Sequence, residues 1–282
     1  MSSIDPGTAL VFGGAGAIAG AIARRLRDDG YRLVLVDVDE AGLERAAEAL
    51  GCAVRTHAVD LSTPAGIHRA AGWLADEHAD ATLVVCAAGV IEPGDVRHLA
   101  PTELDRHVHV NLLAPMHLLR AAAIPMAARG SGDLVAIVSM GGILALAGSA
   151  AYSASKFGLR GFLTALRSEL DPVGVRVMGI YPSGVDTPML RHEALNGGSA
   201  LNFVGRVHTA EDVADAVQRA LRTGRLETYV PYADSISTRL VATWPWAIGP
   251  LLGMFTRIGE RGRAAFLADR GLAMHAGDRS SP

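Results

Sequence analysis

Short apolar runs alternate with longer mixed stretches along most of this 282-residue chain, and that alternation limits the folds it can adopt. A short apolar run bounded by turn residues predicts a buried strand, and a longer stretch with helical periodicity predicts a helix. We expect strands at residues 9–12, 32–36, 53–59, 81–86, 134–138, 175–180 and 228–230. Strands that alternate with helices build a parallel sheet with helices on both faces, so the sequence predicts a doubly wound α/β domain.

A turn of small residues joins the first predicted strand to a helix expected at 21–29. It reads Gly13-Gly14-Ala15-Gly16-Ala17-Ile18-Ala19-Gly20, and Gly14-x-Gly16-x-x-Ala19 fits the fingerprint of dinucleotide-binding proteins. Small residues let the backbone approach a pyrophosphate, and the N-terminus of the following helix attracts the anion. The turn therefore predicts a dinucleotide site that includes Gly13, Gly14, Gly16, Ala17 and Ile18.

Asp37 ends the second predicted strand, about twenty residues beyond the turn, where a carboxylate can bind the adenosine ribose hydroxyls and repel a 2′-phosphate. Because the turn contains no basic residue, we expect NAD as the cofactor and regard NADP as less suitable. The alternative is that Asp37 caps the next helix, although Asp39 can do so equally well. Asp60 and Leu61 follow the third strand and are expected near adenine, with helix entry as the alternative role of Asp60.

The stretch from Ser139 to Lys156 follows the fifth predicted strand and carries groups suited to proton transfer. Tyr152 and Lys156 stand four residues apart in a helix expected at 150–170, so their side chains share one face. A lysine charge about 6 Å from the phenol favours the phenolate by roughly 3 kcal/mol at an effective dielectric of about 20, which moves the tyrosine pKa from about 10 towards neutrality. Ser139 can hold a substrate oxygen. The Tyr-x-x-x-Lys spacing alone is more often a solvent-exposed pair, so its interpretation depends on the cofactor site.

Asn111 is a polar residue inside a long apolar helical stretch at 101–129 that Pro115 and Pro125 should kink or break. A buried amide must find partners, so Asn111 either holds a water directed towards Lys156 or bridges backbone groups.

Two other loops are expected beside the cofactor because they follow predicted strands. The turn after the fourth strand contains Ala87, Ala88 and Gly89, and the loop after the sixth strand contains Pro182, Val185 and Thr187. Thr187 can contact the nicotinamide carboxamide, or it can be an ordinary turn threonine. Residues 190–207 look mobile and suit a lid over the substrate.

These residues together resemble the short-chain dehydrogenase/reductase family over about residues 8–231, most of the chain. The resemblance implies a single Rossmann-like domain, a nicotinamide cofactor, and a homodimer or homotetramer. It also implies that Tyr152 is the general acid/base, that Lys156 holds the nicotinamide ribose and lowers the phenol pKa, that Ser139 orients the substrate oxygen, and that Asn111 supports a proton-relay water.

The chain departs from the family pattern at three places. Phe12 precedes the glycine turn where the family has threonine, Cys86 and Ala87 replace two asparagines after the fourth strand, and Ser183 replaces the glycine that usually follows Pro182. These changes concern cofactor affinity and leave the catalytic residues intact.

Composition and charge exclude several other classes. The formal net charge is −3, so no basic excess indicates nucleic acid. Two cysteines, Cys52 and Cys86, are too few for a disulfide framework, and no metal-binding spacing of His, Cys or Asp occurs. The first residues lack the pattern of a secretion signal, so we expect a cytoplasmic protein.

The C-terminal part is expected to extend one domain that spans 1–282. Residues 8–231 form the Rossmann-like core, 232–274 an apolar extension, and 275–282 a disordered polar tail. The segment 240–256 contains no charge and has four helix-interrupting residues, Pro245, Gly249, Pro250 and Gly253. It can pack as core, line a substrate pocket, or make a weak membrane-surface contact.

The sequence therefore predicts an enzyme that moves hydride between NAD(P) and a secondary alcohol or ketone. An apolar substrate such as a steroid or fatty acyl derivative is expected from the uncharged residues after the fifth strand, Met140, Gly141, Leu144 and Leu146. The alternative is a non-catalytic NAD-sensing or scaffolding protein on the same fold. The intact Ser-Tyr-Lys set argues against that alternative, because a pure binder needs no polarised phenol.

Overall fold

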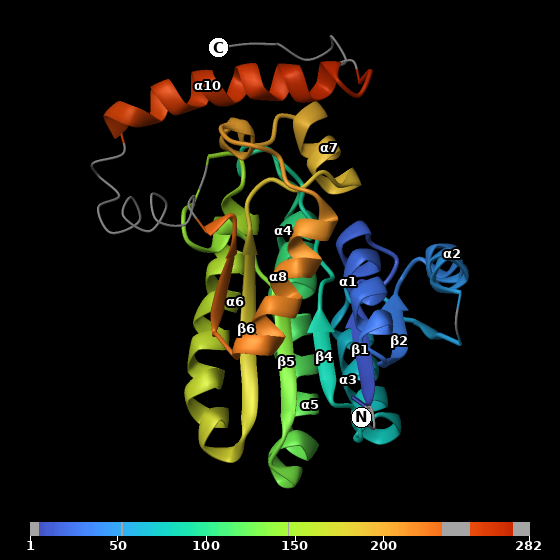
Figure 1. The fold of residues 1–282 in the computed structure, drawn as a ribbon. Coiled ribbons are helices and arrows are strands. Elements are labelled where there is room, and N and C mark those ends of the chain that lie inside the picture. Colours follow the sequence, from blue (N-terminus) through green and yellow to red (C-terminus); the bar gives the residue numbers. More distant parts are fainter. Residues whose placement is uncertain (1–5, 52, 146, 233–248, 273–282) are drawn as a thin grey trace.

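A parallel sheet forms the centre of the protein (Figure 1). The structure, a computed structural model, describes residues 6–51, 53–145, 147–232 and 249–272. Within these residues the sheet has seven strands in the order β3-β2-β1-β4-β5-β6-β7, and every pair is parallel. The strands are β1 (Thr8–Phe12), β2 (Arg32–Asp37), β3 (Arg55–Ala58), β4 (Leu83–Cys86), β5 (Gly132–Ile137), β6 (Val175–Pro182) and β7 (Glu227–Val230). The predicted doubly wound α/β fold is confirmed.

Helices cover both faces of this sheet, which explains why its strands are continuous apolar runs. Helices α1 (Ala17–Asp28) and α8 (Ala210–Thr223) pack together on one face, with α2 (Glu40–Leu50) beside α1. Helices α3 (Pro64–Glu77), α5 (Ala114–Arg129) and α6 (Ala150–Leu170) cover the other. Alternate residues of β1 supply the two cores: Leu10 and Phe12 belong to one cluster, and Ala9 and Val11 to the other.

The long helical stretch after β4 is interrupted next to Pro115, one of the two prolines predicted to kink or break it. Helix α4 (Pro101–Val108) passes into a π-helical turn, η1 (His109–Leu113), and α5 follows. Pro115 has no N–H to donate to the carbonyl of Asn111, and the π turn accommodates this because Ala114 N–H donates to His109 O. Pro125 lies inside α5 without ending it. The break therefore falls at Asn111, a predicted site residue.

Two other boundaries correct the sequence prediction near the site. Helix α1 begins at Ala17 instead of residue 21, because the turn already closes where Gly16 N–H donates to Gly13 O over 2.9 Å. Ala17 and Ile18 are therefore in the first helical turn. Strand β6 continues to Pro182, two residues beyond the predicted end, where Ser183 N–H still bonds to Val230 O.

A smaller cap lies beyond the carboxyl end of the sheet. It consists of α7 (Pro188–Leu195), η4 (Ala200–Phe203) and α10 (Gly249–Ala268), which share an apolar cluster of Leu190, Ala194, Phe203, Phe266 and Leu267. The segment predicted as a mobile lid is thus largely helical.

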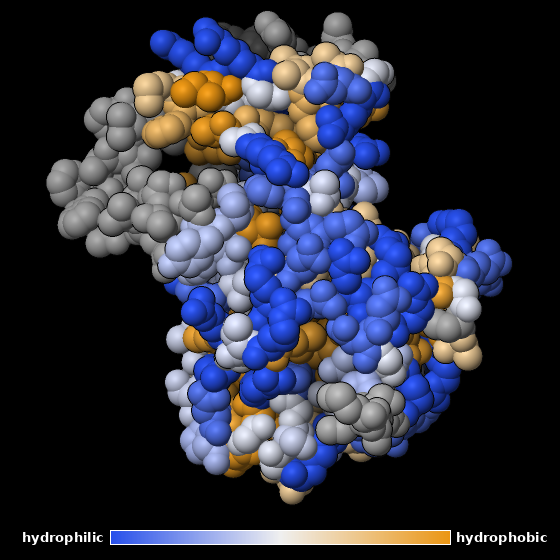
Figure 2. All heavy atoms as spheres, viewed as in Figure 1, coloured by the Kyte–Doolittle hydropathy of each residue, from blue (hydrophilic) through white to orange (hydrophobic). Residues whose placement is uncertain are grey.

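Helix α10 also corrects the expectation that 249–256 would be interrupted, since Pro250 lies in the first turn, where proline is tolerated. Gly259 and Gly262 bring the helix against the backbone of η4. Its N-terminal half exposes Met254, Phe255 and Ile258, and apolar side chains gather there in Figure 2. Residues 240–248 and 275–282, with the predictions made for them, lie outside the described part.

One helical stretch in the described part of the chain, Pro101–Arg129, is long and apolar enough to cross a membrane by composition. Of its most apolar window, 56% is buried inside the protein. It packs against α3, α6, β4 and β5, which is the arrangement of a core helix.

Candidate active site

The serine and the tyrosine come together at the carboxyl end of β5. Ser139 lies two residues beyond the strand, and its Oγ accepts a hydrogen bond from Gly141 N–H at 2.9 Å. Helix α6 starts at Ala150, as predicted, and places Tyr152 in its first turn. A Cβ built on Gly141 would lie 3.1 Å from the Tyr152 ring and 3.3 Å from Ser139 Oγ, so the three groups surround one small space.

The lysine lies one turn further along α6 and is buried, with 4% of its surface exposed. Its Nζ donates to Ile137 O at 3.0 Å and lies 5.7 Å from the centre of the Tyr152 ring. Burial lowers the Lys156 pKa to about 8, although the nearby Cys86 raises it slightly. The charge therefore stands next to the phenol and has no carboxylate partner among the described residues.

The Tyr152 pKa departs from the direction that the spacing predicted. Burial raises it above its ordinary value, the Ser139 hydrogen bond lowers it in part, and the charge of Glu193 raises it further. The attraction of Lys156 favours the phenolate, but the cost of removing the phenolate from water is larger here. In this structure the protonated phenol is the favoured form at neutral pH.

Asn111 is fully buried, and its amide links the Val90 backbone to the Ser155 side chain. Its Oδ1 accepts from Val90 N–H at 2.8 Å, while Nδ2 donates to Val90 O and to Ser155 Oγ. These bonds match the bridging alternative. A Cβ on Gly89 would nevertheless lie 3.5 Å from Asn111 Oδ1 and 3.8 Å from Lys156 Nζ, so the amide and the ammonium border the same space.

The glycine turn forms a narrow cradle across the ends of β1, β2 and β4. Gly13 has φ +85°, and a Cβ there would lie 2.5 Å from Ala88 N, while one on Gly14 would lie 2.8 Å from Leu35 Cβ. Gly16 is the N-cap of α1 and has no side chain to accept a hydrogen bond, so the first N–H groups of the helix have no capping acceptor. Such a helix start attracts a pyrophosphate, and Ala87, Ala88 and Gly89 line the neighbouring turn.

Asp37 lies beside this cradle at the end of β2. Its Oδ2 accepts from Ala15 N–H at 3.1 Å and its Oδ1 from Val38 N–H at 2.7 Å. Asp39 caps α2, because its Oδ1 accepts from Gly42 N–H. Asp37 is therefore not the cap of this helix. Asp37 thus has the position expected for a residue that contacts the adenosine ribose.

Asp60 follows β3 and folds back on its own loop. Its Oδ1 accepts from Ser62 N–H at 2.8 Å, and the hydrogen bonds of Ser62 lower its pKa. Thr63 caps α3, so Asp60 is not the helix cap, and Leu61 is buried in the core.

The loop after β6 contains the remaining predicted cofactor residues. Pro182 is the last residue of the strand, and Val185 forms a bridge with His208. Thr187 caps α7, because its Oγ1 accepts from Leu190 N–H at 3.3 Å. In this structure the Thr187 hydroxyl bonds locally, as an ordinary turn threonine would, and this bond does not involve the cofactor position.

The predicted substrate residues lie in the loop that joins β5 to α6. Met140 and Gly141 form a 3-10 turn directly after Ser139, and Leu144 follows it, partly exposed. Leu146 lies outside the described residues.

Two residues near the site were missed by the sequence analysis, Met189 and Glu193, both on α7. A Cβ on Gly89 would lie 3.9 Å from Met189 Cε, and Lys156 Nζ would lie 3.8 Å from the same point. Glu193 is 6% exposed and acts electrostatically on Tyr152. The available signal was helical spacing, since Glu193 follows the buried Leu190 by three residues.

Comparison with known proteins agrees with this arrangement. The model of the short chain dehydrogenase family matches residues 7–198. A 1-deoxy-11-beta-hydroxypentalenate dehydrogenase of Streptomyces avermitilis is 33% identical over 244 residues, 84% of this chain and 88% of that protein. A 3-alpha-(or 20-beta)-hydroxysteroid dehydrogenase of Mycobacterium bovis is 33% identical over 182 residues, 64% of this chain and 70% of that protein.

Solved structures share the fold. A short-chain dehydrogenase from Sphingobium yanoikuyae in complex with NADPH has a TM-score of 0.73 at 24% identity, covering 88% of this chain and 95% of that one. A 3-ketoacyl-(acyl-carrier-protein) reductase from Brucella melitensis complexed with NADH has a TM-score of 0.68 at 26% identity, covering 79% and 96%. With a family match that spans more than half of its length, the chain belongs to the short-chain dehydrogenase family.

Proposed function

We propose that this protein is an NAD-dependent oxidoreductase that moves hydride between the nicotinamide and a secondary alcohol or ketone on an apolar substrate. NAD(P)-dependent oxidoreduction follows from the family. The observation that carries the proposal is the convergence of Ser139, Tyr152 and Lys156 beside the glycine cradle.

We assign each residue of the site a separate role in the reaction, according to its position. When bound, the nicotinamide accepts or supplies the hydride. Ser139 holds the substrate oxygen, and Tyr152 exchanges a proton with it. The charge of Lys156, 5.7 Å from the ring centre, stabilises the phenolate whenever it forms. Asn111 fixes the backbone at Val90 and is proposed to orient a water near Lys156.

The direction of proton transfer follows from the Tyr152 pKa. Because burial raises that pKa, the phenol is protonated at neutral pH and is ready to donate to a ketone oxygen. Alcohol oxidation needs the phenolate, so its rate should increase as the pH rises. We therefore propose that near pH 7 the site holds the protonation state that ketone reduction requires.

The cofactor proposal rests on Asp37. Its carboxylate stands at the ribose end of the cradle, and the first turn of α1 contains no basic residue to bind a 2′-phosphate. Relatives of known structure are found with NADPH and with NADH, so the family admits both cofactors.

The substrate proposal rests on the apolar surroundings of the site. Met140 and Leu144 lie next to Ser139, and Met189 reaches towards Gly89. A relative acts on hydroxysteroids by name, which supports a bulky apolar alcohol or ketone.

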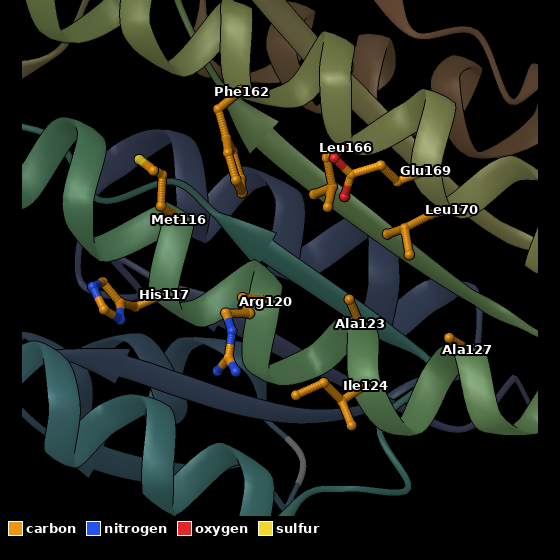
Figure 3. A pocket seen from close by; sticks show the side chains of 10 residues that line it. All are labelled: Met116, His117, Arg120, Ala123, Ile124, Ala127, Phe162, Leu166, Glu169 and Leu170. Atoms are coloured by element: carbon orange, nitrogen blue, oxygen red, sulfur yellow. The ribbon is translucent and has the colours of Figure 1, made fainter.

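We also propose a cytoplasmic homodimer or homotetramer. An apolar groove runs between α5 and α6 on the outer face, and Ile124 beside it is 59% exposed (Figure 3). Arg120 and Glu169 line the groove on different helices, so a second copy related by a two-fold axis can pair them across the interface. Light scattering of the native chain and of Ile124→Asp tests this, because loss of this interface should shift a dimer to monomer or a tetramer to dimer.

Replacement of Tyr152 by phenylalanine tests the catalytic proposal. Loss of the proton-transfer group should reduce kcat by about 10²- to 10⁴-fold for apolar ketones, with NADH binding unchanged. NADH absorbance follows turnover, and fluorescence titration follows binding. Equal turnover in the variant and the native protein would overturn the catalytic role, and binding of NADH without turnover of any ketone or alcohol would favour an NAD-sensing protein.

A further inference from the structure

Glu193 carries a buried carboxyl group that the catalytic scheme does not use. The side chain projects from the inner face of α7 and is 6% exposed. Its Oε2 accepts a hydrogen bond from Asn202 Nδ2 at 3.0 Å. No donor among the described residues bonds to Oε1, and this oxygen is not one of the fully enclosed unpaired atoms, so it remains accessible to a small donor.

The carboxyl group lies within electrostatic reach of the reacting centre. Its negative charge raises the pKa of Tyr152, although the two residues belong to different elements. Burial in turn raises the pKa of Glu193 to about 7, and only the Asn202 hydrogen bond opposes this effect. Glu193 is therefore electrostatically coupled to the phenol, and no cation is among the groups that shift its own pKa.

The charged groups around Glu193 are occupied elsewhere. Arg191 pairs with Asp186 at 3.0 Å, and His192 Nε2 lies 3.3 Å from Glu92 Oε1. On α10, Arg263 pairs with Glu260 and donates to Gly198 O at 3.1 Å. None of these cations is among the groups that shift the Glu193 pKa.

A purely structural role does not account for a carboxyl group at this position. The bond to Asn202 joins α7 to η4, and a glutamine would accept it equally well without the cost of burying a charge. A buried ionisable group that is electrostatically coupled to a reacting phenol, with one oxygen free of protein donors, is instead typical of a site that binds a ligand.

We propose that Glu193 is a specificity-determining residue that accepts a hydrogen bond from a second polar group of the substrate, a hydroxyl or an ammonium, away from the reacting carbon. This inference rests on the proposed oxidoreductase function. Its favoured substrates are apolar ketones that carry such a donor. Binding of the donor pairs Oε1 and reduces the unfavourable effect of the Glu193 charge on a Tyr152 phenolate.

The size of the preference follows from the strength of a hydrogen bond to a charged group. A matched ketone that lacks the donor leaves the carboxylate unpaired, so its kcat/KM should be about 10- to 100-fold lower. The preference should increase as the pH rises through about 7, because the carboxylate is the better acceptor.

The test compares three ketones on one apolar skeleton in NADH-dependent reduction: a hydroxyketone, an aminoketone and the parent ketone. We expect the native protein to prefer at least one donor ketone by tenfold or more in kcat/KM at pH 8. Glu193→Gln, which keeps the shape and the Asn202 bond, should reduce that ratio to below about threefold. Asn202→Ala removes the anchor and keeps the carboxyl group, so it should keep the ratio once the pH is high enough to ionise Glu193, whose pKa rises further without the Asn202 bond.

A second readout separates charge from structure. Because the Glu193 charge raises the Tyr152 pKa, Glu193→Gln should move the rise of alcohol oxidation with pH to lower pH. If Glu193→Gln does not fold, Glu193→Met takes its place and should favour the parent ketone.

The outcomes distinguish the two proposals. If the native protein reduces ketones with no donor preference, or if Glu193→Gln keeps the native ratio, the inference about Glu193 is wrong and the oxidoreductase proposal stands. If the native protein reduces none of a broad ketone panel, the oxidoreductase proposal is wrong and this inference is wrong with it.

Discussion

The two sides of the active site are built by different means. The nucleotide cradle is made mainly of backbone: Gly13 N–H and Gly14 N–H both donate to Val36 O, and Ala15 N–H donates to Asp37. The cap beyond the carboxyl end of the sheet is made of side chains on α7, η4 and α10, which pack through Leu190, Phe203 and Phe266. Backbone contacts fix a shape for one invariant ligand, whereas side chains can change to suit different substrates. The cradle should therefore be intolerant of substitution, and the cap should determine specificity.

The largest effect is expected at Gly13, where a substitution would break the cradle. Gly13→Ala places a methyl group 2.5 Å from Ala88 N at φ +85°, so we expect a loss of about 3 kcal/mol in the free energy of unfolding. Urea denaturation measures this loss. Gly51→Ala is the matched control, because Gly51 has φ +63° and no neighbour within 4 Å, and it should lose only about 1 kcal/mol. Equal losses at both positions would show that backbone conformation, and not the close approach, governs the cradle.

The same contrast explains how much of the molecule could be predicted from the sequence. The cradle and the sheet follow local rules: apolar runs give strands, small residues give the turn, and Thr63 and Thr209 cap helices as their sequence patterns indicate. Helix α6 has the predicted bounds because one continuous periodic stretch encodes it. These features depend on neighbours in the chain.

The cap depends on contacts between distant segments, so local patterns in its sequence predict it only weakly. Residues 190–207 contain Asn196-Gly197-Gly198 and look mobile, yet α10 packs against η4 and orders the segment. The burial of Glu193 follows from that packing and not from its own sequence. The direction of the Tyr152 pKa was missed for the same reason, since desolvation is a property of the assembled site.

A second prediction concerns the stability of the cap. The Glu193 pKa is raised from 4.5 to about 7 in the folded protein, so the unfolded chain loses its proton first as the pH rises. The native protein should therefore lose about 3 kcal/mol relative to Glu193→Gln between pH 4.5 and pH 7 or above. Unfolding free energies of both proteins at pH 5 and pH 8 measure the change. A constant difference across this range would mean that the carboxyl group is solvated, and that the cap is more open than its packing indicates.

The smallest effect is expected at Asp37, where the cradle relies on one side chain. Asp37→Asn keeps an oxygen for Ala15 N–H and removes the charge that repels a 2′-phosphate. The ratio of the NADP and NAD dissociation constants should fall by about tenfold, which corresponds to about 1.4 kcal/mol. Fluorescence titration with NADH and NADPH measures both constants. Asp39→Asn is the control, because Asp39 caps α2 and should leave the ratio unchanged. Tighter binding of NADPH than of NADH by the native protein would contradict the assignment of Asp37, and would mean that side chains determine ligand choice on both sides of the site.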